Sequence, residues 1–437
     1  MWNVLRGGTL LRRLTVIWII LAALAIPMSP LAAPLQIITV WLPGFAAYRV
    51  NIIEDFQAEY SGLRLNLICQ PVENYRDLVL TAMVSTAGPD LGLVDFTAWA
   101  PLAEAGLCEP LGDYLADMRD LHAITPSLLT ILSTGGKVTA LPVTAHPMAL
   151  LIRQDWLTKL GLKPPATWDD FMVLAEAFTK KDPDGDGKKN TYGLAERWPA
   201  GDTEAALRFL PWLYQAGGTV AVNQGGKWPA AFGQSAGARA LRLRRKLWEA
   251  GDIAPSAPTD TAQEMLALFT AGQIGMLMAD DGCLPAVKQA QGARVISVLL
   301  PRDVKRATFG GGQAFFLNAG SNRKRSAFYF VQWWLSRDTQ LKLILGWDGK
   351  PGGTGADAGA LVLSPRLDLD PAALLGEPLY AGFCKSFAYL QPEPYFPAYE
   401  AVKSVMAKAI AAAMGPDKTV EEALAAGTSE ANAILSR

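Results

Sequence analysis

The stretch KDPDGDGKKNTYG, residues 181–193, has the residue types and spacing of the start of a calcium-binding loop. Its aspartates stand at positions one, three and five, where carboxylates bind Ca²⁺, and Gly187 supplies the turn at position six. The candidate ligands are Asp182, Asp184, Asp186, Lys188 at position seven and Asn190 at position nine. Position twelve is Gly193 instead of the bidentate Glu of an EF-hand, so we expect no calcium-driven switch. A structural calcium ion and a plain solvated turn both remain open.

Residues that could catalyse a reaction do not form a recognisable set. GQSAG (233–237) matches the GxSxG string of hydrolases, but that fold needs a histidine after the serine. The two histidines, His122 and His146, both precede Ser235, which we interpret as a helix N-cap. Two histidines also exclude HExxH and most histidine-rich metal sites, and no GxxxxGK[ST] phosphate-binding loop occurs. We therefore predict no catalytic residues.

Asp280 and Asp281 are the carboxylate pair that could serve general acid–base chemistry, as in a glycosidase. Adjacent residues rarely converge on one substrate, so we interpret this pair as a polar loop that follows a buried strand. An exported carbohydrate-active enzyme stays an alternative to a binding protein.

Length and charge limit the classes of protein further. The chain has 437 residues, which predicts two domains. Apolar residues make up 50% and charged residues 19%, as in a folded globular protein. The net charge is -1 without a long basic run, so we expect no nucleic-acid partner. The 13 tryptophans could belong to the core or cover a ligand.

The N-terminus has the pattern of an export signal. Arg6, Arg12 and Arg13 precede the apolar run 14–26, which is too short to span a bilayer comfortably, and small residues follow it. We predict a signal peptide over residues 1–33 and a periplasmic location, with an uncleaved anchor as the alternative. Export permits disulfides, and Cys69, Cys108, Cys283 and Cys384 allow three pairings. No CxxC pair occurs, so neither a redox nor a zinc site is expected.

Apolar periodicity predicts alternating strands and helices in the first part of the mature chain. The expected elements are a strand at 35–44, a helix at 51–60, a strand at 63–70, a helix at 75–86, and a strand followed by a helix within 87–115. This alternation predicts an α/β fold with a parallel sheet between helices. Ligands of such sheets bind beyond the carboxyl ends of the strands, here the loops after Val40 and Val94.

The rest of the chain is expected to be richer in helix. Helices are predicted at 167–181 with Thr167 as N-cap, at 235–251 and at 323–336, and over the last forty residues. A helix, a turn and a buried strand are predicted within 261–282, and the glycine-rich stretch 346–359 is expected to be a loop.

Five segments, in order, resemble one family. AGPDLGLVDFTAWAPLAEAGLCEPLGDYL (87–115) is similar to the AGxxPD…AGxLxPL signature of extracellular solute-binding proteins of bacterial ABC importers. Its closest resemblance is to the sugar-binding family that includes maltose-binding protein. The other segments are GGKVTALP (135–142), PPATWDDF (164–171), FTAGQIGM (269–276) and GGQAFFLNAGSNRKRSAFYFVQWWLSRDTQ (311–340). Together they cover nearly the whole mature chain.

The resemblance implies a type II periplasmic-binding-protein fold, in which two α/β lobes are joined by crossover strands and close on a ligand by a hinge motion. Lobe one would combine 34–144 with 286–340, and lobe two would combine 145–285 with 341–437. The closed form would be recognised by the transmembrane permease of the importer, and the protein, expected to be a monomer, would do no chemistry. A binding protein that serves as a sensor partner is a further alternative.

The resemblance also implies which residues contact the ligand. Carried over residue by residue, they are Trp41, Asp95, Trp99, His146, Asp280, Asp281, Gln313, Trp347 and Tyr395. Aromatic rings cover the apolar face of a pyranose, while Asp, Gln and His bind its hydroxyl groups.

Several positions depart from the family pattern. Leu151 and Ile152 replace the usual aromatics, and Arg153 replaces Asn; Gln273 and Gly275 stand where Lys and Ala are usual. A sugar or small oligosaccharide is therefore the expected ligand, with a polyol or a phosphorylated glycerol as alternatives. The predicted loops carry no cluster of Arg, which would have favoured a phosphate-bearing ligand.

Overall fold

The computed structural model describes residues 36–85, 88–347, 349 and 363–436. The predicted signal peptide, 1–33, and most of the glycine-rich stretch lie outside these residues. Within the part of the chain that is described, every helix is too short or too polar to cross a membrane.

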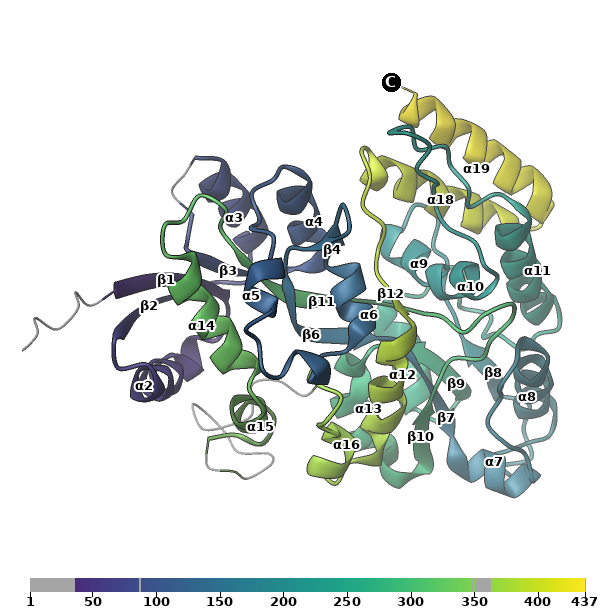
Figure 1. The fold of residues 1–437 in the computed structure, drawn as a ribbon. Coiled ribbons are helices and arrows are strands. Elements are labelled where there is room, and N and C mark those ends of the chain that lie inside the picture. Colours follow the sequence, from purple (N-terminus) through teal and green to yellow (C-terminus); the bar gives the residue numbers. More distant parts are fainter. Residues whose placement is uncertain (1–35, 86–87, 348, 350–362, 437) are drawn as a thin grey trace, which may run out of the picture.

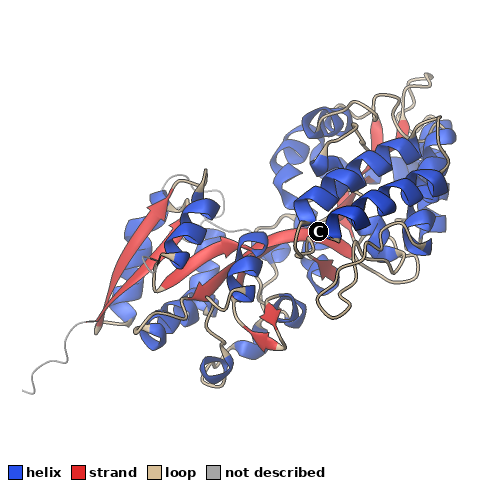
Figure 2. Ribbon diagram, turned by 90° about the horizontal axis from the view of Figure 1, so that it is seen from above, coloured by secondary structure: helices blue, strands red, loops and turns tan. Residues whose placement is uncertain are grey.

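The molecule has two lobes, each built around one sheet (Figures 1 and 2). In lobe one the strand order is β12-β11-β3-β1-β2, and β6 pairs with β11. These strands are β1 (Gln36–Pro43), β2 (Leu63–Gln70), β3 (Leu91–Asp95), β6 (Leu141–Pro147), β11 (Thr308–Leu317) and β12 (Leu390–Gln391). β1 pairs in parallel with β2 and β3, whereas β11 runs antiparallel to β3 and β6. The predicted parallel βαβ arrangement is thus confirmed for the first three strands.

Lobe one is completed by helices that pack on its sheet. They are α2 (Arg49–Glu59), α3 (Tyr75–Val84), α4 (Phe96–Glu104), α5 (Gly112–Leu115), α6 (Pro126–Ile131), α14 (Lys324–Leu335) and α15 (Arg337–Leu345), with a hairpin of β4 (Ser133–Thr134) and β5 (Lys137–Val138). The aromatic rings of α2 and α14 meet over the sheet, where Phe56 lies edge-on to Phe330 and Trp333. This burial of large rings holds the two helices against β1.

Lobe two has a four-stranded sheet in the order β10-β7-β9-β8. Its strands are β7 (Ala149–Arg153), β8 (Tyr192–Ala195), β9 (Ile274–Ala279) and β10 (Val295–Val298). Its helices are α7 (Gln154–Leu160), α8 (Trp168–Lys180), α9 (Thr203–Leu207), α10 (Leu210–Gln215), α11 (Ser235–Glu249), α12 (Ala262–Thr270), α13 (Leu284–Gln291), α18 (Tyr399–Met414) and α19 (Val420–Leu435). Figure 1 shows α8, α11, α18 and α19 gathered on this lobe, away from β1 and β2.

Local signals explain where the lobe-two helices begin. Thr167 caps α8 as predicted: its hydroxyl accepts a hydrogen bond from the Asp170 amide, and the Asp170 carboxylate accepts one from the Thr167 amide at 2.9 Å. The prediction for Ser235 is wrong by one position, because Gln234 is the N-cap and Ser235 is the first residue of α11. Gly275 departs from the family pattern for a steric reason, since a Cβ there would lie 2.1 Å from the Phe178 ring.

Within the described residues the chain passes between the two sheets three times. Met148 alone separates β6 from β7, and the segment after β10 returns the chain to lobe one as β11. The third passage contains α16 (Pro371–Leu374), α17 (Ala381–Ser386) and β12, which pairs with the start of β11. Its ends are tied by hydrogen bonds from Thr144 Oγ1 to the Leu363 carbonyl and from the Gly382 amide to Ser297 Oγ, both 2.8 Å.

The lobe boundaries differ from the expectation in several places. β12 was expected in lobe two with 341–437, but it pairs with β11 in the lobe-one sheet. Two further differences concern β10 and the end of α15. β10 was expected in lobe one with 286–340, but it pairs antiparallel with β7 and so belongs to the lobe-two sheet. Residues 341–345 were expected in lobe two, but they complete α15, and Leu343 is buried in the core under β1. Sequence spacing did not reveal these points because each depends on which sheet a segment packs against.

Candidate functional site

Polar side chains meet where the carboxyl end of β3 lies beside β11. In the strand register Gln313 pairs with Asp95 on one side and with Thr144 on the other. Gln313 lies in the middle of β11, which begins at Thr308. Asp95 is exposed and caps α4, because its Oδ1 accepts hydrogen bonds from the Ala98 amide and from Thr97 Oγ1.

His146 and Asp281 join the two lobes at this place. His146 lies two residues after Thr144 on β6, and Asp281 lies in the short 3-10 helix that follows β9. His146 Nδ1 is 2.8 Å from Asp281 Oδ1. Burial lowers the pKa of His146, but the hydrogen bond to Asp281 and the charges of Asp281 and Asp280 outweigh burial and raise the pKa. The contact thus links His146 of β6 with Asp281 of the loop after β9.

Asp280 has a local role at the same loop. Its Oδ1 accepts a hydrogen bond from the Gly282 amide at 2.9 Å and caps the 3-10 helix. The two aspartates thus turn away from each other, one toward its own backbone and one toward His146. Because β9 ends at Ala279, both stand beyond the carboxyl end of a lobe-two strand, as we predicted.

Three successive glycines of β11 leave its main chain bare next to His146. Gly311 pairs with His146, and within the described residues no heavy atom lies within 4 Å of the position of a Cβ there. Its neighbours are closely packed: a Cβ on Gly310 would lie 2.3 Å from the His146 carbonyl oxygen, and one on Gly312 would lie 2.5 Å from the Phe96 ring. Gly311 therefore presents open backbone between Gln313 and His146.

A buried set of charges lies behind the Asp280 loop, and the sequence reasoning missed it. Arg208 follows α9, and its Nη2 donates to the carbonyl of Met278 in β9 at 2.8 Å. Glu196 follows β8 and accepts a hydrogen bond from Arg244 Nη2 at 2.8 Å. Burial lowers the pKa of Arg208; the positive charges of neighbouring arginines add to this, while Glu196 and Asp280 oppose it. The available signal was the short apolar run YGLA (192–195), whose end carries Glu196.

The first two predicted aromatic residues lie in lobe one and are well packed. Trp41 is half-buried near the end of β1, and its carbonyl accepts a hydrogen bond from the Tyr75 hydroxyl at 3.1 Å. Trp99 was predicted in a loop, but the residues after Asp95 form α4, and Trp99 is 6% exposed inside that helix. The correction follows from Asp95, whose cap starts the helix at once.

The two late aromatic residues lie apart from this group in different ways. Trp347 stacks on Tyr48 with ring centroids 5.9 Å apart, and its indole nitrogen donates to Asp55 of α2 at 2.9 Å. Tyr395, between β12 and α18, is 42% exposed. The structure thus brings together Asp95, Gln313, His146, Asp280 and Asp281. Trp347 lies on lobe one, in contact with Tyr48 and Asp55.

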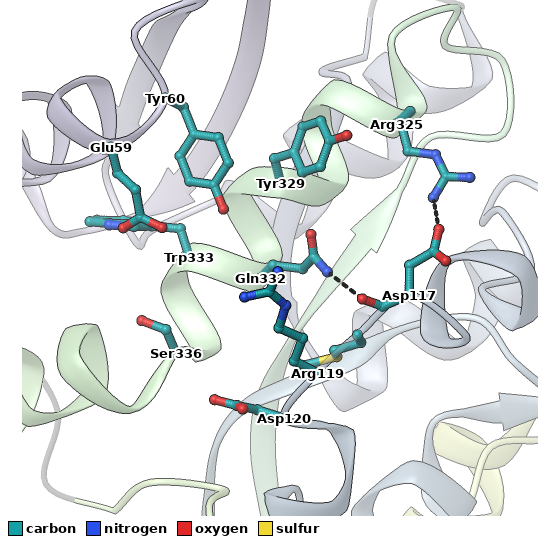
Figure 3. A pocket seen from close by; sticks show the side chains of 11 residues that line it. Glu59, Tyr60, Asp117, Arg119, Asp120, Arg325, Tyr329, Gln332, Trp333 and Ser336 are labelled. Atoms are coloured by element: carbon teal, nitrogen blue, oxygen red, sulfur yellow. Dashed lines mark hydrogen bonds and ion pairs between the residues drawn. The ribbon is translucent and has the colours of Figure 1, made fainter.

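A separate cavity of about 560 Å³ lies on lobe one between α2, α14 and the segment after α5 (Figure 3). It is lined by Glu59, Tyr60, Asp117, Met118, Arg119, Asp120, Arg325, Tyr329, Gln332, Trp333 and Ser336. Its charges largely satisfy one another, since Arg325 pairs with Asp117 at 2.7 Å and Asp120 pairs with Arg366 at 3.1 Å. Every lining residue belongs to lobe one, so this cavity is distinct from the group at the strand ends.

The aspartate loop gathers its carboxylates as the spacing predicts. The ligand atoms of Asp182, Asp184 and Asp186 lie within 4.8 Å of one another. Partial burial and the hydrogen bond with Asp182 raise the pKa of Asp184. Lys159 Nζ donates to the Asp182 carbonyl at 3.1 Å, so an ammonium group already lies against the loop. A bound calcium stays a prediction, which only a measurement with the ion can test.

The missing acid at position twelve has a steric cause. Gly193 lies in β8, and a Cβ on it would lie 2.4 Å from the carbonyl oxygen of Ala175 in α8. No larger residue fits at this point without moving α8 away from the sheet. A complete EF-hand ligand set is therefore incompatible with the way this strand packs.

The four cysteines, all among the described residues, are free thiols in this structure. Cys108 is buried and the other three are half-buried, and burial raises the pKa of each thiol. The pairings left open by the sequence are thus not formed here.

Comparisons with known proteins agree with this architecture. A model of the family described as bacterial extracellular solute-binding protein matches residues 41–341. The polygalacturonan/rhamnogalacturonan-binding protein YtcQ of Bacillus subtilis (strain 168) is 27% identical over 183 residues, which are 40% of this chain and 35% of YtcQ. The match thus spans about a third of that relative.

Two solved structures share the fold over nearly the whole chain. The cyclic alpha-maltosyl-1,6-maltose binding protein from Arthrobacter globiformis has a TM-score of 0.72 and 21% identity, covering 91% of this chain and 98% of that one. An ABC transporter solute binding protein from Agrobacterium vitis S4, with bound D-mannitol, has a TM-score of 0.62 and 22% identity, covering 92% and 98%. At these identities the likeness establishes the fold, and the two-lobe fold class predicted from the sequence is confirmed.

Proposed function

The chain belongs to the family of bacterial extracellular solute-binding proteins, and from that membership we propose that it is the substrate-binding component of an ABC importer. It captures a sugar or polyol between its two lobes and delivers it to a membrane permease. It acts in the periplasm as a monomer and catalyses no reaction.

The observation that carries this proposal is the polar group at the lobe junction. Asp95 and Gln313 come from lobe one, His146 from the strand that leaves it, and Asp281 from lobe two. Carboxylates accept hydrogen bonds from sugar hydroxyls, and the Gln amide both donates and accepts. A ligand held between such groups from two lobes favours their approach, which is the basis of hinge closure.

The relatives support the ligand class. They are a cyclic alpha-maltosyl-1,6-maltose binding protein, a solute binding protein with bound D-mannitol and a polygalacturonan/rhamnogalacturonan-binding protein, and all of these ligands are polyhydroxylated. The bare backbone at Gly311 adds support, because a ligand can approach a strand closely only where no side chain intervenes.

Isothermal titration of the full mature chain against a panel of monosaccharides, oligosaccharides and polyols tests the proposal. At least one member should bind with a Kd on the order of 1 μM, equivalent to about 8 kcal/mol. Gln313→Ala should weaken that binding about tenfold by removing two hydrogen-bonding groups. The matched control is Gln332→Ala on α14, whose amide donates weakly to the Asp117 carbonyl in the separate cavity and which should bind normally.

Two outcomes would contradict the proposal. If the chain unfolds cooperatively, and so is folded, but binds no member of the panel, the proposed role in transport is wrong. Release of shorter products from glycan polymers would instead favour the exported enzyme.

A further inference from the structure

Arg208 is a buried cation without a carboxylate of its own. Its side chain is 9% exposed, and its Nη2 donates only to a main-chain carbonyl, that of Met278. Among the described residues, no acceptor lies within hydrogen-bond reach of its Nε. The nearest carboxylate oxygen is Oε2 of Glu196, 3.9 Å from that nitrogen. A buried guanidinium in this state is costly, because it has given up water without gaining a hydrogen-bonded carboxylate among the described residues.

Glu196 is only a distant counter-ion of Arg208, because closer donors engage both of its oxygens. Its Oε2 accepts from Arg244 Nη2 at 2.8 Å, and its Oε1 accepts from Trp212 Nε1 at 3.2 Å. Glu196 and Arg244 are both fully buried and neutralise each other. Arg197 is paired separately with Asp202. Arg208 is thus the arginine of this set whose carboxylate contact is longest, 3.9 Å to Glu196, and is not a hydrogen bond.

Arg208 lies close to the loop that forms part of the candidate site. It is bonded to Met278, two residues before Asp280, and the charges of Asp280 and Arg208 influence each other. The charge of Arg208 also lowers the pKa of Cys283, against the larger effect of burial. Cys283 lies in the 3-10 helix that Asp280 caps. The cation therefore stands at the carboxyl end of β9, behind the loop that bonds His146.

The two aspartates of this loop do not cancel Arg208 by direct contact. Asp281 is engaged by His146, and Asp280 Oδ1 is engaged by the Gly282 amide. Within the described residues, neither forms an ion pair with Arg208. An oxyanion that reached Arg208 would meet a guanidinium without a hydrogen-bonded carboxylate among the described residues, next to carboxylates already held toward other partners.

We propose that the ligand captured at the lobe junction carries an oxyanion, and that Arg208 holds it. The shared chemistry is a saccharide bearing a carboxylate, as in a uronic acid, or a phosphate, as in a sugar phosphate. Guanidinium binds both in a planar fork with charge-assisted hydrogen bonds. This inference rests on the proposed function and goes further by assigning the charge of the substrate.

The test is titration of the full mature chain, at low salt and neutral pH, with matched acidic and neutral ligands. The probes are trigalacturonate against maltotriose, and glucose 6-phosphate against glucose. One acidic probe should bind at least about tenfold more tightly than its neutral partner, as expected for a charge-assisted hydrogen bond. Raising the salt concentration should weaken that acidic probe more than the neutral one.

Variants locate the effect. Arg208→Gln should abolish the preference for the acidic probe, and Arg208→Lys should retain part of it, because the charge stays but the fork is lost. The control is Arg239→Gln, an exposed arginine on α11 paired with Asp303, which should keep the wild-type preference. Thermal unfolding of each variant establishes that it is folded, and the salt dependence of the wild type tests the charge without any substitution.

The results distinguish a carboxylate from a phosphate, and they separate the role of Arg208 from the proposed function. A preference for trigalacturonate assigns a carboxylate, and one for glucose 6-phosphate assigns a phosphate. Equal affinity for acidic and neutral probes, or a preference that survives in Arg208→Gln, overturns the role of Arg208 while the binding function stands. Failure to bind any acidic, neutral or polyol probe overturns the proposed function and the inference together.

Discussion

Replacing Gly312 with alanine should destabilise the strand that joins the two lobes, whereas the same change at Gly311 should not. A Cβ on Gly312 would lie 2.5 Å from the Phe96 ring and 2.5 Å from the main-chain oxygen of Thr144. The Thr144 contact is with backbone, so no change of side-chain rotamer relieves it. Phe96 is 5% exposed and is itself packed in the core, which limits how far its ring can move.

The two alanine variants differ by an amount that can be worked out. Overpacking of this kind costs about 1–3 kcal/mol. At Gly311, where no atom of the described residues lies within 4 Å of a Cβ, alanine instead gains about 0.4–1 kcal/mol by restricting the unfolded chain. The variants should therefore be separated by about 1.5–4 kcal/mol in free energy of unfolding.

Calorimetry of both variants, with hydrogen exchange of the β11 amides, measures this difference. Hydrogen exchange is needed because a two-lobe protein need not unfold in one step, and it reports on the strand itself. The Gly312 variant should exchange faster along Gly310–Gln313 and bind ligand more weakly, because Gln313 is the next residue. Equal stability of the two variants, or a larger loss at Gly311, would refute the claim that close packing dictates glycine at position 312.

Three further predictions concern charged groups. The pKa of His146 is raised in the folded state, so protonation of His146 stabilises the folded protein. This stabilisation is complete below the ordinary histidine pKa of about 6.5 and is lost as the pH rises through the raised value. Unfolding of wild type and Asp281→Asn should therefore show the wild type to be more stable near about pH 5.5 and the two to be equal near about pH 9. Calcium should raise the thermal midpoint of the wild type but not of Asp184→Asn, and a midpoint that ignores calcium in both leaves the loop a plain turn. Glu196→Gln should lower the free energy of unfolding by about 3–5 kcal/mol in urea denaturation, because it strips Arg244 of its buried counter-ion; a loss below about 1 kcal/mol would contradict that pairing.

Most elements of the fold could be predicted because their signals are local. The cap of α8 needs only Thr167 and an acid three residues later, and both are read directly from the sequence. The burial pattern of β1 and the helical spacing of α14 are equally local, and both elements were found within a residue or two of their ends. Lobe boundaries were less well predicted, since β10 and the end of α15 are assigned by their packing partners.

The candidate site was predicted in part, for the same reason. The rule that ligands bind beyond strand ends led to the loop after Val94 and so to Asp95, whereas Asp280 and Asp281 came from the family resemblance. It failed for Trp99, where Asp95 starts a helix in place of the expected loop. It also could not find Arg208, which lies after a short helix and reaches β9 only through the folded chain.

The sequence by itself determined the α/β class, the cap of α8 and the incomplete calcium loop, because these depend on residues a few positions apart. The two-lobe arrangement came from the family resemblance. Two contacts were decided by the tertiary structure alone. His146 contacts Asp281, which lies 135 residues away in the sequence, and Glu196 accepts a hydrogen bond from Arg244. Such pairings follow from strand register and from helices packing on a sheet, which place distant side chains within a few ångströms. Charge balance at the site is a property of that arrangement, which is why Arg208, without a hydrogen-bonded carboxylate among the described residues, emerges only in the folded molecule.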